Sequence, residues 1–145
     1  MANKNTIDKY MLGLSGEYAV CSELLRRNKM ASITMGNAKG VDIIVLYPNE
    51  GQTYKKIEVK TSQTTQFVTS FFRKYYDINM PHPDIWVLVH IDADTKAIRY
   101  FMLTHEELGN IQMARNKITS WQYSKGCDNV LLKEVLPYEN RWDII

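Results

Sequence analysis

The first pattern along the chain is helical. Between residues 6 and 29, apolar side chains recur at spacings of three and four, which predicts one long helix with Asn28 near its end. The arc that should face the core consists of Leu14, Tyr18, Val20, Cys21, Leu24 and Leu25. Glu17 lies in the middle of this arc, where a carboxylate is costly unless a cation or several donors meet it. Glu17 is therefore a candidate functional residue.

Two strand-like segments follow, at residues 41–47 and 53–60, and the turn-like residues between them predict a hairpin. If the intervening residues form the whole loop, the strand register sets Asp42 directly across from Glu58. Side-chain alternation then places Lys60 on the same face as Glu58. The hairpin thus brings two acids and a lysine onto one face.

The rest of the chain alternates strand and helix signals. Thr104 and Glu107 have the spacing of a capping box, which predicts a helix from there to about residue 115. The apolar residues at the C-terminus should dock on the body of the protein. The remaining expectations are a loop with a short helix at residues 61–79, a strand buried on both faces at 85–91, its partner strand at 97–103, and either a strand or a helical turn at 130–136.

Composition bounds the class of protein without indicating a partner. A chain of 145 residues and 16.9 kDa falls in the size range of one domain, so we expect residues 1–145 to form a single domain. Hydrophobic residues make up 45% and charged residues 23%, close to ordinary globular composition, so neither a disordered nor a fibrous chain is indicated. The 18 basic and 16 acidic residues leave a net charge of only +2, too small to attract a polyanion by bulk charge.

The cysteines and the apolar runs predict a cytoplasmic protein with no membrane segment. Only Cys21 and Cys127 are present, and two cysteines do not make the disulfide framework of a small secreted domain. The N-terminus lacks the apolar region of a signal peptide. No later stretch reaches the roughly 18 to 20 apolar residues that a membrane span needs.

The predicted hairpin face indicates metal-dependent chemistry. Two acids facing each other across strands repel by roughly 0.2–1 kcal/mol, so a stable hairpin would avoid placing Asp42 opposite Glu58 unless a cation bridges them. Carboxylate oxygens are the ligands that Mg²⁺ and Mn²⁺ prefer. Such an ion can activate a bound water and neutralise charge on a phosphoryl oxygen, while the Lys60 ammonium orients the nucleophile or stabilises the transition state. Asp42, Glu58 and Lys60 therefore predict a phosphodiester hydrolase, with Glu17 as the fourth member.

Structural alternatives remain for these residues. Glu17 could lie at the edge of the core and pair with an arginine or lysine. The hairpin face could be solvated, with Glu58 and Lys60 forming an incidental pair, because a Glu-x-Lys sequence is common by itself.

Three segments together resemble the PD-(D/E)XK nuclease superfamily, and specifically its resolvase-like branch, across residues 14–91. They are GEYAV at residues 16–20, KGVDIIV at residues 39–45 and IEVKTS at residues 57–62. One departure is Val41, which stands where the name-giving motif of the family has proline. The resemblance implies a restriction-endonuclease-like α/β fold, with a mixed central sheet of four to five strands flanked by helices.

The same resemblance assigns roles to the four residues of the candidate site. It implies that Asp42 and Glu58 are metal ligands, that Glu17 assists metal binding, and that Lys60 is the catalytic lysine. The implied cofactor is Mg²⁺ or Mn²⁺.

Residues 71–76 interleave aromatic side chains with Arg73 and Lys74, a composition used to contact nucleic acid, although half-buried loop packing gives the same pattern. We also expect Lys39 and Gln63 to contact substrate. The alternative for Gln63 is that it has no function, because polar residues are common directly after a strand. The histidines lack the spacing of a zinc site, and His105 should be surface structure.

The sequence therefore predicts a metal-dependent endonuclease acting on DNA, of restriction, repair or resolvase type. The alternatives are a catalytically inactive module that binds nucleic acid or supports assembly, and a purely structural or protein-binding domain. Cleavage of both strands would suit a homodimer, with residues 121–123 or the C-terminal tail at its interface.

Overall fold

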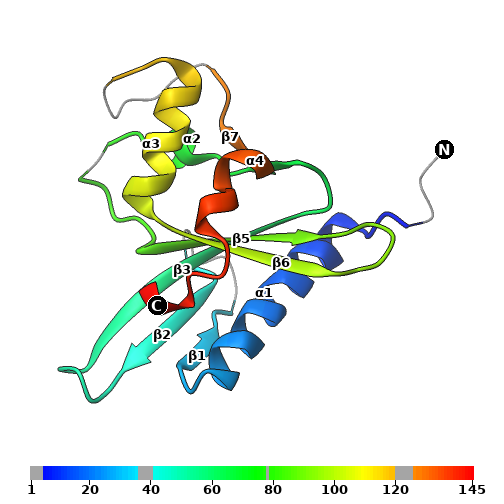
Figure 1. Cartoon of the computed structure of the whole chain (residues 1–145). Coiled ribbons are helices and arrows are strands. Elements are labelled where there is room, and N and C mark those ends of the chain that lie inside the picture. The colour runs from blue at the N-terminus through cyan, green and yellow to red at the C-terminus, as the bar shows by residue number, and fades with distance from the viewer. Residues whose placement is uncertain (1–4, 36–40, 78, 120–125) are drawn as a thin grey trace.

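The computed structural model describes residues 5–35, 41–77, 79–119 and 126–145. A five-stranded sheet forms its centre, with helix α1 on one face and helices α2 and α3 on the other (Figure 1). The elements, in chain order, are α1 (Lys9–Arg26), β1 (Met30–Ile33), β2 (Ile43–Tyr47), β3 (Thr53–Ser62), β4 (Gln66–Val68), α2 (Phe71–Lys74), β5 (Ile85–Ile91), β6 (Ile98–Thr104), α3 (His105–Asn116), β7 (Asn129–Leu131), α4 (Leu132–Val135), η1 (Leu136–Tyr138) and η2 (Trp142–Ile144).

The central sheet is mixed. Its strand order is β1-β2-β3-β5-β6, and β3 and β5 run parallel while the other neighbouring pairs are antiparallel. Strands β4 and β7 form a separate antiparallel pair. This arrangement confirms the expected α/β class, with a mixed central sheet of five strands flanked by helices.

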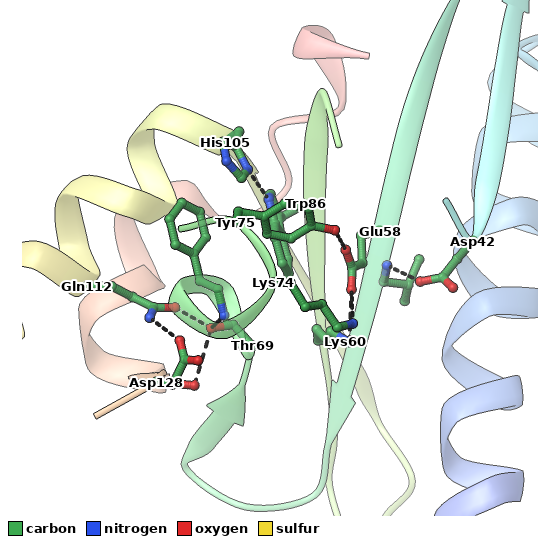
Figure 2. A network of polar contacts seen from close by, with 12 residues as sticks. Asp42, Glu58, Lys60, Thr69, Lys74, Tyr75, Trp86, His105, Gln112 and Asp128 are labelled. Atoms are coloured by element: carbon green, nitrogen blue, oxygen red, sulfur yellow. Dashed lines mark hydrogen bonds and ion pairs between the residues drawn. The ribbon is translucent and has the colours of Figure 1, made fainter. Parts of the chain in front are cut away.

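The β2–β3 hairpin has the register expected from the sequence. Tyr47 pairs with Thr53 and Ile43 pairs with Ile57, so continuing the ladder by one residue sets Asp42 across from Glu58. The turn between the strands includes Gly51 at φ 75°, a conformation that glycine adopts without steric cost. The predicted register is therefore confirmed, but the two carboxylates do not share one face, because the Asp42 side chain turns to the Val59 amide on the other side of β3 from the Glu58 carboxylate (Figure 2).

Strand β5 separates two apolar cores. Its alternate residues, such as Val87 and Val89, pack in the core that includes Val20 and Leu24 of α1. Trp86 and the other intervening side chains pack in a second core with residues of α2, α3 and α4. Burial on both faces explains the nearly continuous apolar sequence of this strand and confirms the prediction.

The C-terminal half follows the sequence expectations closely. The capping box is present, because the Thr104 amide donates to Glu107 Oε1 at 2.9 Å and the Glu107 amide donates to Thr104 Oγ1 at 3.1 Å. Residues 130–136, predicted as either a strand or a helical turn, include both part of a strand, β7, and a helical turn, α4. Ile145 is 3% exposed, so the tail docks on its own chain. The other expected dimer interface, residues 121–123, lies outside the described residues.

Three sequence expectations need correction. Strands β1 and β4 were not predicted, because each is short and its sequence, MASI or QFV, does not alternate apolar and polar residues. On α1, Tyr18 is 63% exposed and Leu25 is 54% exposed, although both belong to the predicted inward arc. The apolar arc of α1 is wider than the face that the sheet covers. None of the helices in the described ranges is long and apolar enough to cross a membrane.

Candidate active site

Asp42 stands directly before β2 and is fixed by both neighbouring strands. Its amide donates to the carbonyl of Ile57 at 2.9 Å, and its carbonyl accepts from the amide of Thr34 at 2.9 Å. Its side-chain Oδ2 accepts from the amide of Val59 at 2.7 Å. Burial raises the pKa of the Asp42 carboxyl, and the nearby charge of Glu58 raises it further against the opposing effects of the Val59 amide and Lys60. A cation at this carboxylate would relieve both penalties.

Glu17 approaches Asp42 from helix α1. Burial raises the pKa of Glu17, and the charge of Asp42 together with a hydrogen bond to it raises this pKa further. In the described part of the chain no salt bridge to Glu17 is formed, although the charge of Lys60 partly offsets the rise of the Glu17 pKa. Two carboxyl groups from separate elements therefore lie side by side.

Gly16 sets how closely α1 approaches β3. A Cβ atom at this position would lie 1.8 Å from Thr61 Oγ1 and 2.9 Å from Thr61 Cβ, far inside ordinary contact. Only glycine fits between the helix and this strand without a shift. The close approach places the next residue, Glu17, against the start of β2.

Glu58 lies opposite Asp42 but is directed at a different set of groups. Its carboxylate is buried, with the residue 2% exposed. Oε1 lies 3.0 Å from Lys60 Nζ and 3.3 Å from Lys74 Nζ, and Oε2 accepts a hydrogen bond from the Tyr75 hydroxyl at 2.8 Å. Figure 2 shows these three donors around the Glu58 carboxylate, with Asp42 turned to the other side of β3. Glu58 is therefore fully engaged by side chains of the protein.

Helix α2 is held in place by a buried polar network. Asp128 Oδ1 accepts from the Phe72 amide at 2.9 Å, and Oδ2 accepts from the Arg73 amide at 3.2 Å. The Gln112 side-chain amide donates to Asp128 Oδ1 at 2.9 Å, and Thr69 Oγ1 donates to Gln112 Oε1 (Figure 2). Gln112 and Thr69 are fully buried. This network orients the segment that carries Lys74 and Tyr75 toward Glu58.

An aromatic cluster supports Tyr75 from behind. Its ring packs edge-on against Trp86, with centroids 5.9 Å apart, and against His105, with centroids 5.2 Å apart. Burial and the Glu58 charge raise the pKa of the Tyr75 hydroxyl, which stays protonated and donates. The expectation of a surface His105 is wrong, because this residue is 6% exposed and its Nδ1 accepts from Trp86 Nε1 at 3.0 Å. Burial, with a smaller effect of His82, lowers the pKa of His105 to about 3.

The residues expected to contact substrate differ in their surroundings. Gln63 already uses its side chain within the protein, accepting from the Ile7 amide at 2.9 Å and donating to the Asn5 carbonyl at 3.4 Å. Arg73 is exposed on α2, and Lys74 contacts Glu58. Lys39 lies outside the described residues.

The segment at residues 71–76 satisfies both interpretations given to it. Phe71, Phe72 and Tyr75 are buried in the second core, as loop packing requires. Arg73, Lys74 and Tyr76 remain exposed, as contact with a polyanion requires. The contact of Lys74 and Tyr75 with Glu58 was missed, since a separation of 16 or 17 residues carries no periodic signal.

Two acids of the site meet the needs of a divalent metal ion. The described residues contain no group of three or more histidine, cysteine, aspartate or glutamate side chains placed to hold one. Asp42 and Glu17 nevertheless offer two adjacent carboxyl groups, each with a pKa raised by burial and by a neighbouring acid. Mg²⁺ usually takes only one or two carboxylates and keeps several waters. The donor set therefore fits Mg²⁺ or Mn²⁺ through Asp42 and Glu17, with Glu58 committed to Lys60, Lys74 and Tyr75.

Comparison with known proteins identifies a shared fold. No family model matches the sequence, and no curated protein sequence matches it. Among solved structures, the bacterial homing endonuclease I-Ssp6803I matches with a TM-score of 0.58 over 96% of this chain and 91% of that chain. The two sequences are 11% identical, so the similarity lies in the fold.

Proposed function

We propose that this protein is a Mg²⁺- or Mn²⁺-dependent endonuclease of the PD-(D/E)XK type that hydrolyses phosphodiester bonds in DNA. The observation that carries the proposal is the convergence of acids and a lysine from three elements. Glu17 comes from α1, Asp42 from the start of β2, and Lys60 with its partner Glu58 from β3. The fold shared with a homing endonuclease supports a nuclease activity by analogy.

The residues have separate roles in this proposal. Asp42 and Glu17 would hold the metal ion, and a bound cation would offset both causes of their raised pKa values, which are burial first and a neighbouring acid second. When bound, the ion would acidify a water and offset charge on the phosphoryl oxygen. Glu58 holds the Lys60 ammonium 3.0 Å away, and a lysine fixed in this way can orient the attacking water or stabilise the transition state.

One observation favours a second candidate function, a catalytically inactive module that binds nucleic acid or supports assembly. Glu58 is neutralised by two lysines and accepts a hydrogen bond from a tyrosine in the described structure. A module that had lost its metal would be stabilised by such contacts, because they satisfy a buried carboxylate without a metal ion. The two candidates differ in whether the protein cuts DNA.

A cleavage assay separates them. The protein is incubated with linear duplex, single-stranded and four-way-junction DNA and with RNA, in Mg²⁺, Mn²⁺ or EDTA. Asp42→Asn, Lys60→Ala and Glu17→Gln remove one group each. Glu23→Gln is the matched control for Glu17→Gln, because Glu23 lies on the same helix and pairs with Arg26 and Arg27 away from the site.

For a nuclease we expect cleavage of DNA that stops in EDTA. Asp42→Asn and Lys60→Ala should each slow it by about a hundredfold or more, the usual effect of removing a group that stabilises developing charge. Glu17→Gln should slow it while Glu23→Gln cuts at the parental rate. If no substrate is cut, or if Asp42→Asn and Lys60→Ala cut as well as the parent, the site is not catalytic and the binding module is the better description.

A further inference from the structure

Glu58 has a second lysine that the proposed reaction does not use. The Lys74 ammonium lies 3.3 Å from Glu58 Oε1, the same oxygen that Lys60 approaches at 3.0 Å. The Lys74 side chain is 41% exposed, against 26% for Lys60 and 3% for Glu58. Lys74 is therefore in contact both with a buried carboxylate and with the solvent at the edge of the site.

The backbone that carries Lys74 is fixed, so only its side chain is free to change partners. Asp128 accepts from the Phe72 and Arg73 amides at the start of α2. Tyr75, the residue after Lys74, is 6% exposed and is packed against Trp86. A lysine on a rigid backbone has a flexible four-carbon stem and a compact charge that can reach a second anion without moving the fold.

We propose that Lys74 is a second active-site lysine that exchanges the Glu58 carboxylate for a phosphate group of the substrate backbone. Without substrate, the Lys74 ammonium neutralises Glu58 and repels a divalent cation arriving near Asp42 and Glu17. When a phosphate reaches the site, Lys74 pairs with it and leaves Glu58 with Lys60 and Tyr75. This inference rests on the proposed nuclease function and adds a coupling between substrate binding and metal binding.

Charge balance explains why the exchange is favourable. The charge of Lys74 already acts on Asp42, because it opposes the rise of the Asp42 pKa. Withdrawing that charge leaves the acids more negative and more attractive to a cation, and the phosphate gains a charge-assisted hydrogen bond. Because binding couplings are reciprocal, a bound metal should also strengthen binding of the phosphate backbone. Substrate and metal would thus favour each other through one side chain.

The test measures metal binding and DNA binding separately in the full-length protein. Lys74→Gln removes the charge and keeps a polar side chain that is one atom shorter. Mn²⁺ binding is followed by electron paramagnetic resonance without DNA, and binding of a fluorescein-labelled duplex is followed by anisotropy in EDTA at fixed salt. Arg73→Gln is the matched control, since it removes one charge from the same helix and no ion pair of Arg73 with Glu58 is present among the described residues.

We expect Lys74→Gln to bind Mn²⁺ about tenfold more tightly than the parent and the duplex about tenfold more weakly, which corresponds to about 1.4 kcal/mol in each direction. Arg73→Gln should bind Mn²⁺ as the parent does. Unchanged or weaker Mn²⁺ binding by Lys74→Gln would refute the repulsion between Lys74 and the metal ion. Unchanged duplex binding by Lys74→Gln would refute the pairing of Lys74 with a backbone phosphate.

The cleavage assay distinguishes this inference from the proposed function. If the parent cuts DNA in Mg²⁺ but Lys74→Gln shows neither shift, the exchange alone is wrong. If Asp42→Asn binds Mn²⁺ as tightly as the parent, the ion is not at this site and the exchange is wrong as well. If the parent neither cuts DNA nor binds Mn²⁺, both proposals fail together.

Discussion

Replacing Gly16 by alanine tests whether the close approach of α1 to β3 positions Glu17. A Cβ atom at this residue would lie 1.8 Å from Thr61 Oγ1, whereas ordinary contact begins at 3.4 Å, so the difference of about 1.6 Å must be absorbed by a shift. Rotating the Thr61 hydroxyl away does not suffice, because Thr61 Cβ would still lie 2.9 Å away. Gly13 on the same helix is the matched control, since a Cβ atom there would meet nothing within 4 Å.

Gly13→Ala should raise the free energy of unfolding, whereas Gly16→Ala should not. Alanine in place of glycine inside a helix stabilises by about 1 kcal/mol, and this gain is all that Gly13→Ala experiences. Gly16→Ala adds an overpacking cost of about 1–3 kcal/mol, so its free energy of unfolding should be unchanged or lower by up to about 2 kcal/mol. Displacing Glu17 by an ångström or more should slow cleavage by about a hundredfold, since catalytic geometry tolerates little misplacement.

Urea denaturation and the DNA cleavage rate in Mg²⁺ measure the two effects. A double substitution, Gly16→Ala with Thr61→Gly, removes every clashing atom of Thr61 and should restore most of the rate. The Thr61 hydroxyl is buried and makes no hydrogen bond in the described structure, so removing it breaks no hydrogen bond. If Gly16→Ala is stabilised and cuts DNA as Gly13→Ala does, the close approach has no role in positioning Glu17.

Two further predictions concern the support of Tyr75 and Glu58. The His105 pKa is about 3 in the folded protein against an ordinary 6.5, so the unfolded state binds the extra proton and stability falls as pH drops between these values, by roughly 2 kcal/mol from pH 6.5 to pH 4.5. His105→Asn keeps an acceptor for Trp86 and should flatten this slope in urea titrations at several pH values; an unchanged slope would contradict the assignment. Asp128→Ala leaves the α2 amides and buried Gln112 without their acceptor and should lower the free energy of unfolding by about 1–3 kcal/mol. The control Asp143→Ala removes an exposed acid and should not lower it. Equal midpoints of the two variants in urea denaturation would refute this role of Asp128.

Local patterns carried the parts of the fold and site that could be predicted. The hairpin register followed from the loop length, and it set Asp42 across from Glu58 with Lys60 on the same face as Glu58. The capping box at Thr104 followed from the spacing of two residues. In each case the residues that interact are close in sequence or are joined by one turn, so a period or a spacing defines their geometry.

Long-range contacts could not be predicted because they depend on where loops end. Tyr75 and Lys74 reach Glu58 only because Asp128, more than 50 residues further along the chain, caps the helix that carries them. Helical periodicity located the apolar arc of α1 but not which part of it the sheet would cover, and Tyr18 was placed on the wrong side for this reason.

Asp42 is the residue that joins the two sides of the site. Glu17 belongs to the α1 side of the sheet and acts on Asp42, while Lys74 reaches the site from the α2 side and also acts on Asp42. Lys74 is not among the charges that shift the Glu17 pKa. Because Asp42 precedes β2 and is held by the Val59 amide at the point where the hairpin strands begin to pair, it is accessible to groups from both layers. A cation at Asp42 would therefore be sensitive both to the packing of α1, through Gly16, and to the substrate, through Lys74.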